Sequence, residues 1–158
     1  MALVAALAVP ALIIHILAAV IWVGGMFFAH QVLRPSAAVL DPEARLTLWS
    51  RVFARFFPWV FTAIVVLLAS GYGLVFVVYG GFSTLPIYVN LMQGIGIGMI
   101  LLFLHLYFAP WRRFHTAVAR QDWVEGGRQL GQIRTIVTIN LVLGLIVVAI
   151  GGSGPYWN

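Results

Sequence analysis

The chain has 158 residues, of which 63% are hydrophobic and only 8% are charged. About a quarter of the residues of a soluble domain are charged, so this composition excludes an ordinary water-soluble fold and indicates a membrane protein. The formal net charge of +5 contains no lysine contribution, and the nine arginines fall around two short connections between apolar stretches. That placement favours a membrane-topology signal over a nucleic-acid-binding surface.

Four apolar stretches are each long enough to cross a bilayer, which takes about 20 mostly apolar residues in a helix. The predicted spanning helices cover residues 7–32, 58–79, 86–109 and 133–151. A segment rich in glycine and proline separates the second helix from the third. The expected fold is therefore a single all-α membrane domain over residues 1–158, a bundle of four transmembrane helices.

The arginines also predict the orientation of the chain. They flank or occupy the connections at residues 34–57 and 111–132, whereas both ends of the chain and the middle connection have none. The positive-inside rule then places both arginine-bearing connections in the cytoplasm and both termini outside, in a bacterial-type inner membrane. Asp41-Pro42-Glu43 and Asp122 have the pattern of helix starts, so both connections are expected to be partly helical. The first of these helical pieces is expected to lie at the membrane interface before it enters the second span.

The few polar side chains within the spans carry most of the functional information, because ionisable groups there are costly and usually face the bundle interior. At a rise of 1.5 Å per residue, His15 lies near the outer surface and His105 in the inner half, roughly 18 Å apart in depth. Two polar layers are therefore expected rather than one site. The inner layer contains His30, His105 and Asn140. The outer layer combines His15 with one or more of Asn90, Met92 and Gln93.

Two glycines, Gly94 and Gly98, share one face of the third predicted helix with His105. Such a face permits another helix to approach closely, or it leaves room for a flat macrocycle. A histidine in this setting can equally hydrogen-bond across the bundle, and Met26 and Met92 can simply fill apolar space. The complete absence of cysteine excludes thiolate metal sites and thiol nucleophiles.

The run from Ile14 to Phe28, which contains His15, Trp22 and Gly24-Gly25, resembles the first helix of the copper-resistance D (CopD) family. Shorter similarities to that family follow in the later helices: Arg55-Phe56 with Trp59, Ser70-Gly71, and the segment from Arg134 through Asn140 to Gly144. The related HemJ-type protoporphyrinogen oxidases have a histidine late in helix three, where this chain has His105. They also carry a lysine early in helix three, and this chain has no lysine. The resemblance implies a four-helix bundle that handles copper or haem, with His15 as the best-matched residue and His105 as the next.

The preferred hypothesis is a protein that binds haem b for electron transfer, or as a membrane haem oxidoreductase. His15 and His105 are the leading ligands, and His30, Gly94 and Gly98 complete the expected cofactor site. Haem is narrowly preferred because isolated buried histidines beside glycine faces fit a macrocycle better than a relay of ion sites.

Two other functions remain open. Copper binding or transport across the membrane would use His15, Met92 and Met26 as ligands. A non-catalytic small subunit, packed in a homo-oligomer or a larger membrane complex, would use the glycine-rich faces. The lipid bilayer is an expected partner in every case, and nucleic acid in none.

Overall fold

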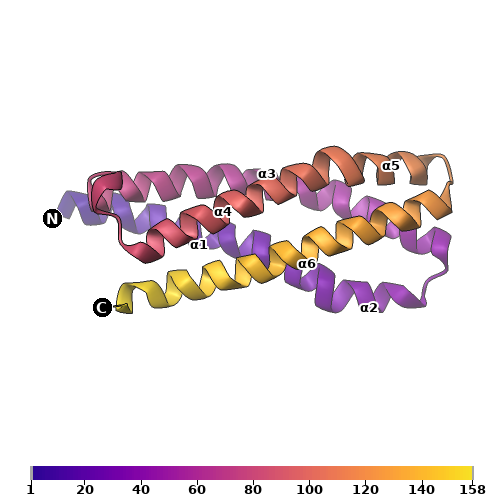
Figure 1. Cartoon of the computed structure of the whole chain (residues 1–158), viewed down its shortest axis with the longest axis horizontal. Helices are drawn as coiled ribbons and strands as arrows, with labels where there is room; N and C mark the ends of the chain where they lie inside the picture. Colours follow the sequence, from indigo (N-terminus) through magenta and orange to yellow (C-terminus); the bar gives the residue numbers. More distant parts are fainter. Residues whose placement is uncertain (1, 158) are drawn as a thin grey trace.

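The computed structural model describes residues 2–157, and over this range the chain is built of helices and short connections without a strand. Figure 1 shows four long helical rods that run along a common axis, with both termini at the same end. Each rod contains a stretch long and apolar enough to cross a membrane, which confirms the predicted all-α bundle with four spans. The elements, in rod order, are α1 (Ala2–Phe27), η1 (Phe28–Leu33), α2 (Arg34–Ser36) and η2 (Ala37–Val39); α3 (Pro42–Tyr79) with η3 (Phe82–Thr84); α4 (Ile87–Leu106), η4 (Tyr107–Trp111) and α5 (Arg112–Ala119); and α6 (Trp123–Ser153) with η5 (Gly154–Tyr156).

The rods are longer than a bilayer requires. Helix α3 alone has 38 residues, about 57 Å at the standard rise, whereas the hydrocarbon core is about 30 Å thick. Most of the two predicted connections is therefore helix that continues the spans. Residues 42–57 form the first turns of α3 and run into the second span, as expected. Leu46, Trp49 and Phe53 of this segment are buried in the core of the bundle.

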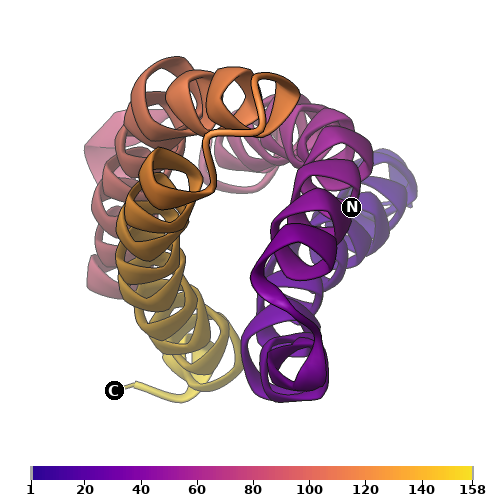
Figure 2. The same ribbon diagram turned by 90° about the vertical axis from the view of Figure 1, so that its right-hand side faces the viewer.

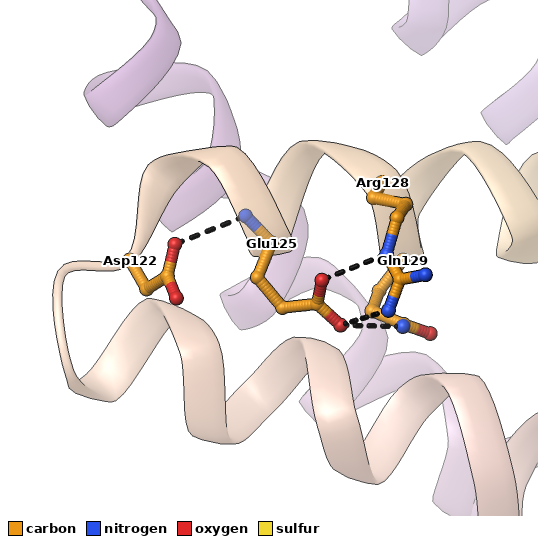
Figure 3. Close-up of polar contacts among 4 residues, drawn as sticks. All are labelled: Asp122, Glu125, Arg128 and Gln129. Carbon is orange, nitrogen blue, oxygen red and sulfur yellow. Dashed lines mark hydrogen bonds and ion pairs between the residues drawn. The ribbon is translucent and has the colours of Figure 1, made fainter.

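Two aspartates begin these helices as the sequence predicts. Asp41 accepts a hydrogen bond from the backbone N–H of Ala44 at 2.9 Å, and Asp122 accepts one from Glu125 at 3.0 Å. In Figure 3, Glu125 also accepts hydrogen bonds from the side chains of Arg128 and Gln129 at 2.7 Å each. The Arg128–Glu125 contact is the single ion pair of the described chain. The arginine-bearing end of the bundle thus keeps an excess of positive charge.

The core joins two pairs of rods. Helix α1 packs mainly on α3 and α4 mainly on α6, and α6 also contacts α1 and α3. Figure 2 shows the four rods end-on, arranged around the long axis. Aromatic rings connect α3 to α4 and η4, with the ring centroid of Phe57 5.6 Å from that of Phe103 and 5.1 Å from that of Trp111. Most aromatic contacts of the core therefore join α3 to the rod that is made of α4, η4 and α5.

A glycine of the first helix permits the close approach of α1 and α3. A Cβ atom at Gly25 would overlap the ring of Phe56, whereas one at Gly24 would meet nothing within 4 Å. On the other side of α1, a Cβ atom at Gly144 of α6 would lie 2.9 Å from a methyl group of Val23. These two contacts are small-residue helix packing, the mode common in membrane proteins.

Candidate functional site

His15 sits between α1 and α3 near the end of the bundle that holds both termini. Its Nδ1 lies 2.9 Å from Oγ of Ser70, and its ring lies over Gly71. A Cβ atom at Gly71 would stand 3.1 Å from Cε1 of His15, so the missing side chain makes space for the imidazole. The pair Ser70-Gly71 therefore holds the His15 ring both by a hydrogen bond and by shape.

The hydrogen bonds of Ser70 favour one of the two neutral tautomers of His15. The Ser70 hydroxyl donates its only hydrogen to the backbone carbonyl of Val66, one turn earlier in α3. Its oxygen is then the acceptor toward His15, so Nδ1 carries the imidazole proton. Nε2 of the neutral ring keeps its lone pair. A histidine whose one nitrogen is fixed by such a neighbour presents the other in the form that binds metal ions.

The other residues of the expected outer layer make local contacts of their own. Asn90 donates to the backbone carbonyls of Leu85 and Pro86, and Gln93 donates to the Tyr72 hydroxyl at 3.2 Å. These bonds shape the α3–α4 connection. None of these bonds involves His15 or Ser70. The His15–Ser70 contact is therefore separate from Asn90 and Gln93, the other polar residues of the predicted outer layer.

The two methionines predicted as copper ligands do not gather around His15. The methyl group of Met92 packs on Gly151 of α6, whereas His15 packs on α3. Met26 is buried in the core with 3% of its surface exposed. Within residues 2–157, no cluster of three or more histidine or acidic side chains has the arrangement of a metal site. The described residues therefore place neither of the predicted methionine ligands beside His15.

The inner-layer residues also lie apart from His15. Trp22 of α1 meets Phe103 of α4 with ring centroids 6.3 Å apart, which sets a common level for the two helices. His15 lies seven residues from Trp22 toward the termini, and His105 lies two residues beyond Phe103 in the other direction. At the helical rise this separates the two histidines by about 13 Å in depth. Nothing in this arrangement brings His15 and His105 to opposite faces of one haem.

His105 and the two glycines form a face of α4 that no other helix within residues 2–157 covers. His105 and Gly94 are exposed, and a Cβ atom at Gly94 or Gly98 would meet nothing within 4 Å. Asn140, by contrast, is buried and donates to the carbonyl of Met99 at 3.1 Å, which ties α6 to α4. The third predicted inner residue, His30, lies in the π-helical segment η1. We refer to Gly94, Gly98 and His105 as the open face of α4.

Comparison with known proteins places the chain in a family. Residues 50–153 match the family described as Copper resistance protein D (CopD). The chain belongs to the CopD family. The match runs from the early turns of α3 to the end of α6, about two thirds of the chain, and confirms the family predicted from the sequence. No curated protein and no solved structure gives a significant match.

The matched region of this CopD chain contains Ser70 and Gly71, whereas His15 lies before it. The sequence alone singled out His15 but missed that Ser70 determines its tautomer. The sequence did contain a sign of this contact. A serine followed by a glycine in an otherwise apolar span offers a hydroxyl beside a position that has no side chain. Only the register between α1 and α3 shows that His15 fills that gap.

Proposed function

We propose that this CopD protein handles copper in the membrane and that Nε2 of His15 is the atom that binds the ion. The observation that carries the proposal is the hydrogen-bonded series His15–Ser70–Val66, which leaves Nε2 unprotonated. A neutral imidazole nitrogen is a good ligand for copper. The family assignment supports the choice of this metal over others.

The incomplete ligand set favours transfer of copper over storage. Of the three predicted ligands, only His15 is prepared for an ion, since Met26 is in the core and Met92 packs on α6. The further ligands of a bound ion would come from the molecule that delivers copper or from a neighbouring chain. A site with one resident ligand exchanges its ion more readily than a closed tetrahedral site. With the predicted topology, His15 receives copper from the outer side of the membrane.

Copper tolerance of cells tests the proposal. Cells that produce the wild-type chain should differ from cells without it in growth at raised copper concentration, and His15→Ala should abolish that difference at equal protein level. His105→Ala is the matched control, because it removes a histidine from the open face of α4 and leaves the His15–Ser70 contact intact. Equal tolerance of wild type and His15→Ala would contradict the proposal.

Haem b remains a second candidate function because of one observation, the open face of α4. A histidine beside two uncovered glycines offers one axial ligand and a flat surface. The placement of His15 and His105 does not fit a haem held by both. The dithionite-reduced minus oxidised visible spectrum of protein purified in mild detergent tests this candidate. Sharp α and Soret bands that disappear in His105→Ala would support haem, and an oxidoreductase or electron-transfer role would then follow.

The same open face also suits the third hypothesis, a subunit of a homo-oligomer or larger complex. A neighbouring helix could approach Gly94 and Gly98 closely, as small-residue faces in membranes permit. A featureless spectrum together with crosslinking through this face would favour a covered interface over a haem.

A further inference from the structure

A small cavity lies at the arginine-bearing end of the bundle, far from His15 along the rods. It is lined by residues of η1, α2, α3 and α6, and its accessible volume is about 20 Å³. That volume is enough for about one water-sized group. The polar side chains on its wall are His30, Arg34, Trp49 and Arg134. Residues of four separate elements therefore enclose a space that one oxygen atom can fill.

Three of these wall residues have a buried nitrogen without a hydrogen-bond partner. The atoms are Nε1 of Trp49, Nε of Arg134 and Nδ1 of His30, and each is fully shielded from solvent. The Trp49 side chain as a whole is only 3% exposed, so its N–H cannot reach water by a change of rotamer alone. Buried polar groups of this kind are normally paired, and leaving one unpaired is unfavourable by about 1–3 kcal/mol. Three residues that line the cavity thus carry a buried nitrogen without a hydrogen-bond partner, and a small shift of these side chains would let an acceptor in the cavity pair with them.

The charge around the cavity has one sign. Arg34 and Arg45 both lie near enough to repel the guanidinium of Arg134. None of the four acids lines the cavity, and the one ion pair of the described chain, Arg128–Glu125, involves none of these arginines. Two further cations near the Arg134 guanidinium, together with the unpaired nitrogens, favour an anion over neutral water.

The depth of the cavity identifies the class of anion. Its wall residues bracket the arginine-side boundary of the predicted spans. His30 lies two residues inside the first span, Arg34 lies two residues beyond it, and Arg134 is the second residue of the fourth span. The cavity therefore lies at the border between the hydrocarbon core and the headgroup layer. Phosphate is the anion that is abundant at this level, and arginine is the side chain that binds it best.

We propose that this cavity binds a phosphate group, with one phosphate oxygen accepting hydrogen bonds from Trp49 Nε1 and Arg134 Nε. The remaining phosphate oxygens lie toward Arg34, which also lines the cavity. His30 Nδ1 donates to the same oxygen in the tautomer that carries its proton there. The phosphate belongs to an anionic phospholipid headgroup or to a free phosphate ion. This site is independent of copper binding at His15.

Native mass spectrometry of the full chain in mild detergent tests the proposal. Short-chain phosphatidylglycerol is titrated against the wild type, with phosphatidylcholine as the zwitterionic comparison and inorganic phosphate as competitor. The wild type should bind one phosphatidylglycerol with clear preference over phosphatidylcholine. Competition by inorganic phosphate at concentrations comparable to those of the lipid would assign the site to free phosphate, and resistance to it would assign the site to the lipid.

Three variants separate a built site from general charge attraction. Trp49→Phe keeps an aromatic ring in the core and removes the N–H together with the five-membered ring of the indole, and it should weaken binding about tenfold. Arg134→Gln should weaken it at least as much, and it serves as a second test where Trp49→Phe is poorly folded by circular dichroism. Arg51→Gln removes the same charge from an exposed position of α3 outside the cavity and should leave binding within about twofold. Absence of lipid or phosphate binding would overturn the proposal, as would equal loss in Arg51→Gln and Arg134→Gln.

Discussion

Oγ of Ser70 lies 2.9 Å from Nδ1 of His15, and this is the one hydrogen bond between side chains of α1 and α3 among the described residues. Because the Ser70 hydroxyl donates to Val66, the contact favours the imidazole tautomer with a free lone pair on Nε2. A residue of the matched CopD region thereby prepares a histidine that lies outside it.

Removal of the Ser70 hydroxyl should therefore weaken copper binding without removing a copper ligand. For Ser70→Ala we expect a loss of about 10–100-fold in copper affinity, the range found when the outer partner of a metal-binding histidine is deleted. Thr62→Ala is the control, since Thr62 makes the same kind of bond to the carbonyl one turn earlier in α3 but contacts no histidine. Competition titration with a chromophoric Cu(I) chelator measures both variants. Equal affinity of Ser70→Ala and Thr62→Ala would show that the tautomer does not matter.

The adjacent glycines of the first helix should respond differently to a methyl group. Gly25→Ala should lower the stability of the bundle by about 1–3 kcal/mol relative to Gly24→Ala, because only the former drives Cβ into the Phe56 ring. Thermal unfolding in detergent, followed by circular dichroism, gives the comparison. Adding Phe56→Leu should recover part of the loss in Gly25→Ala, and failure of that recovery would count against this packing contact.

Glycines of the open face of α4 should tolerate substitution in the single chain. Gly98→Ala should leave the unfolding midpoint unchanged or slightly raised, since Cβ meets no atom there and alanine favours the helix by about 1 kcal/mol. Gly144→Ala should lower the midpoint, because its Cβ would press on Val23 and Met99. A large drop for Gly98→Ala would mean that another molecule covers this face in the purified protein.

The native absence of cysteine permits a direct test of the predicted orientation. Single cysteines placed by Ser83→Cys in the α3–α4 connection and by Ala38→Cys at the arginine-bearing end are both exposed. A membrane-impermeant maleimide added to intact cells should label the first and not the second, in accordance with the positive-inside rule. Labelling of Ala38→Cys alone would reverse the predicted topology.

The sequence was sufficient for the parts of the fold that depend on local pattern. Uninterrupted apolar length predicted four spans, and the Asp41-Pro42 and Asp122 patterns predicted two helix starts that the structure confirms. The apolar spacing of residues 42–57 predicts a helix that runs into the second span, which α3 confirms, but the same spacing suits a surface helix and a buried one equally well. Only the packing of Trp49 and Phe53 against the other rods distinguishes a buried extension from a surface helix.

The candidate site was predictable in its residue types but not in its assembly. Helical periodicity cannot tell which helix lies beside a given face, so it could not reveal that Gly94 and Gly98 face outward. It also could not show that Met92 packs on α6 while His15 packs on α3. The pairing of α1 with α3 and of α4 with α6 is a tertiary property, and the His15–Ser70 contact exists only because of it.

The central claim, that His15 binds copper, is tested most directly by the equilibrium affinity of the purified chain for Cu(I), measured by competition with a chromophoric chelator. Wild type and His105→Ala should have about the same affinity, and His15→Ala should show almost no binding. An unchanged affinity of His15→Ala, or a loss only in His105→Ala, would contradict the account and move attention to the open face of α4.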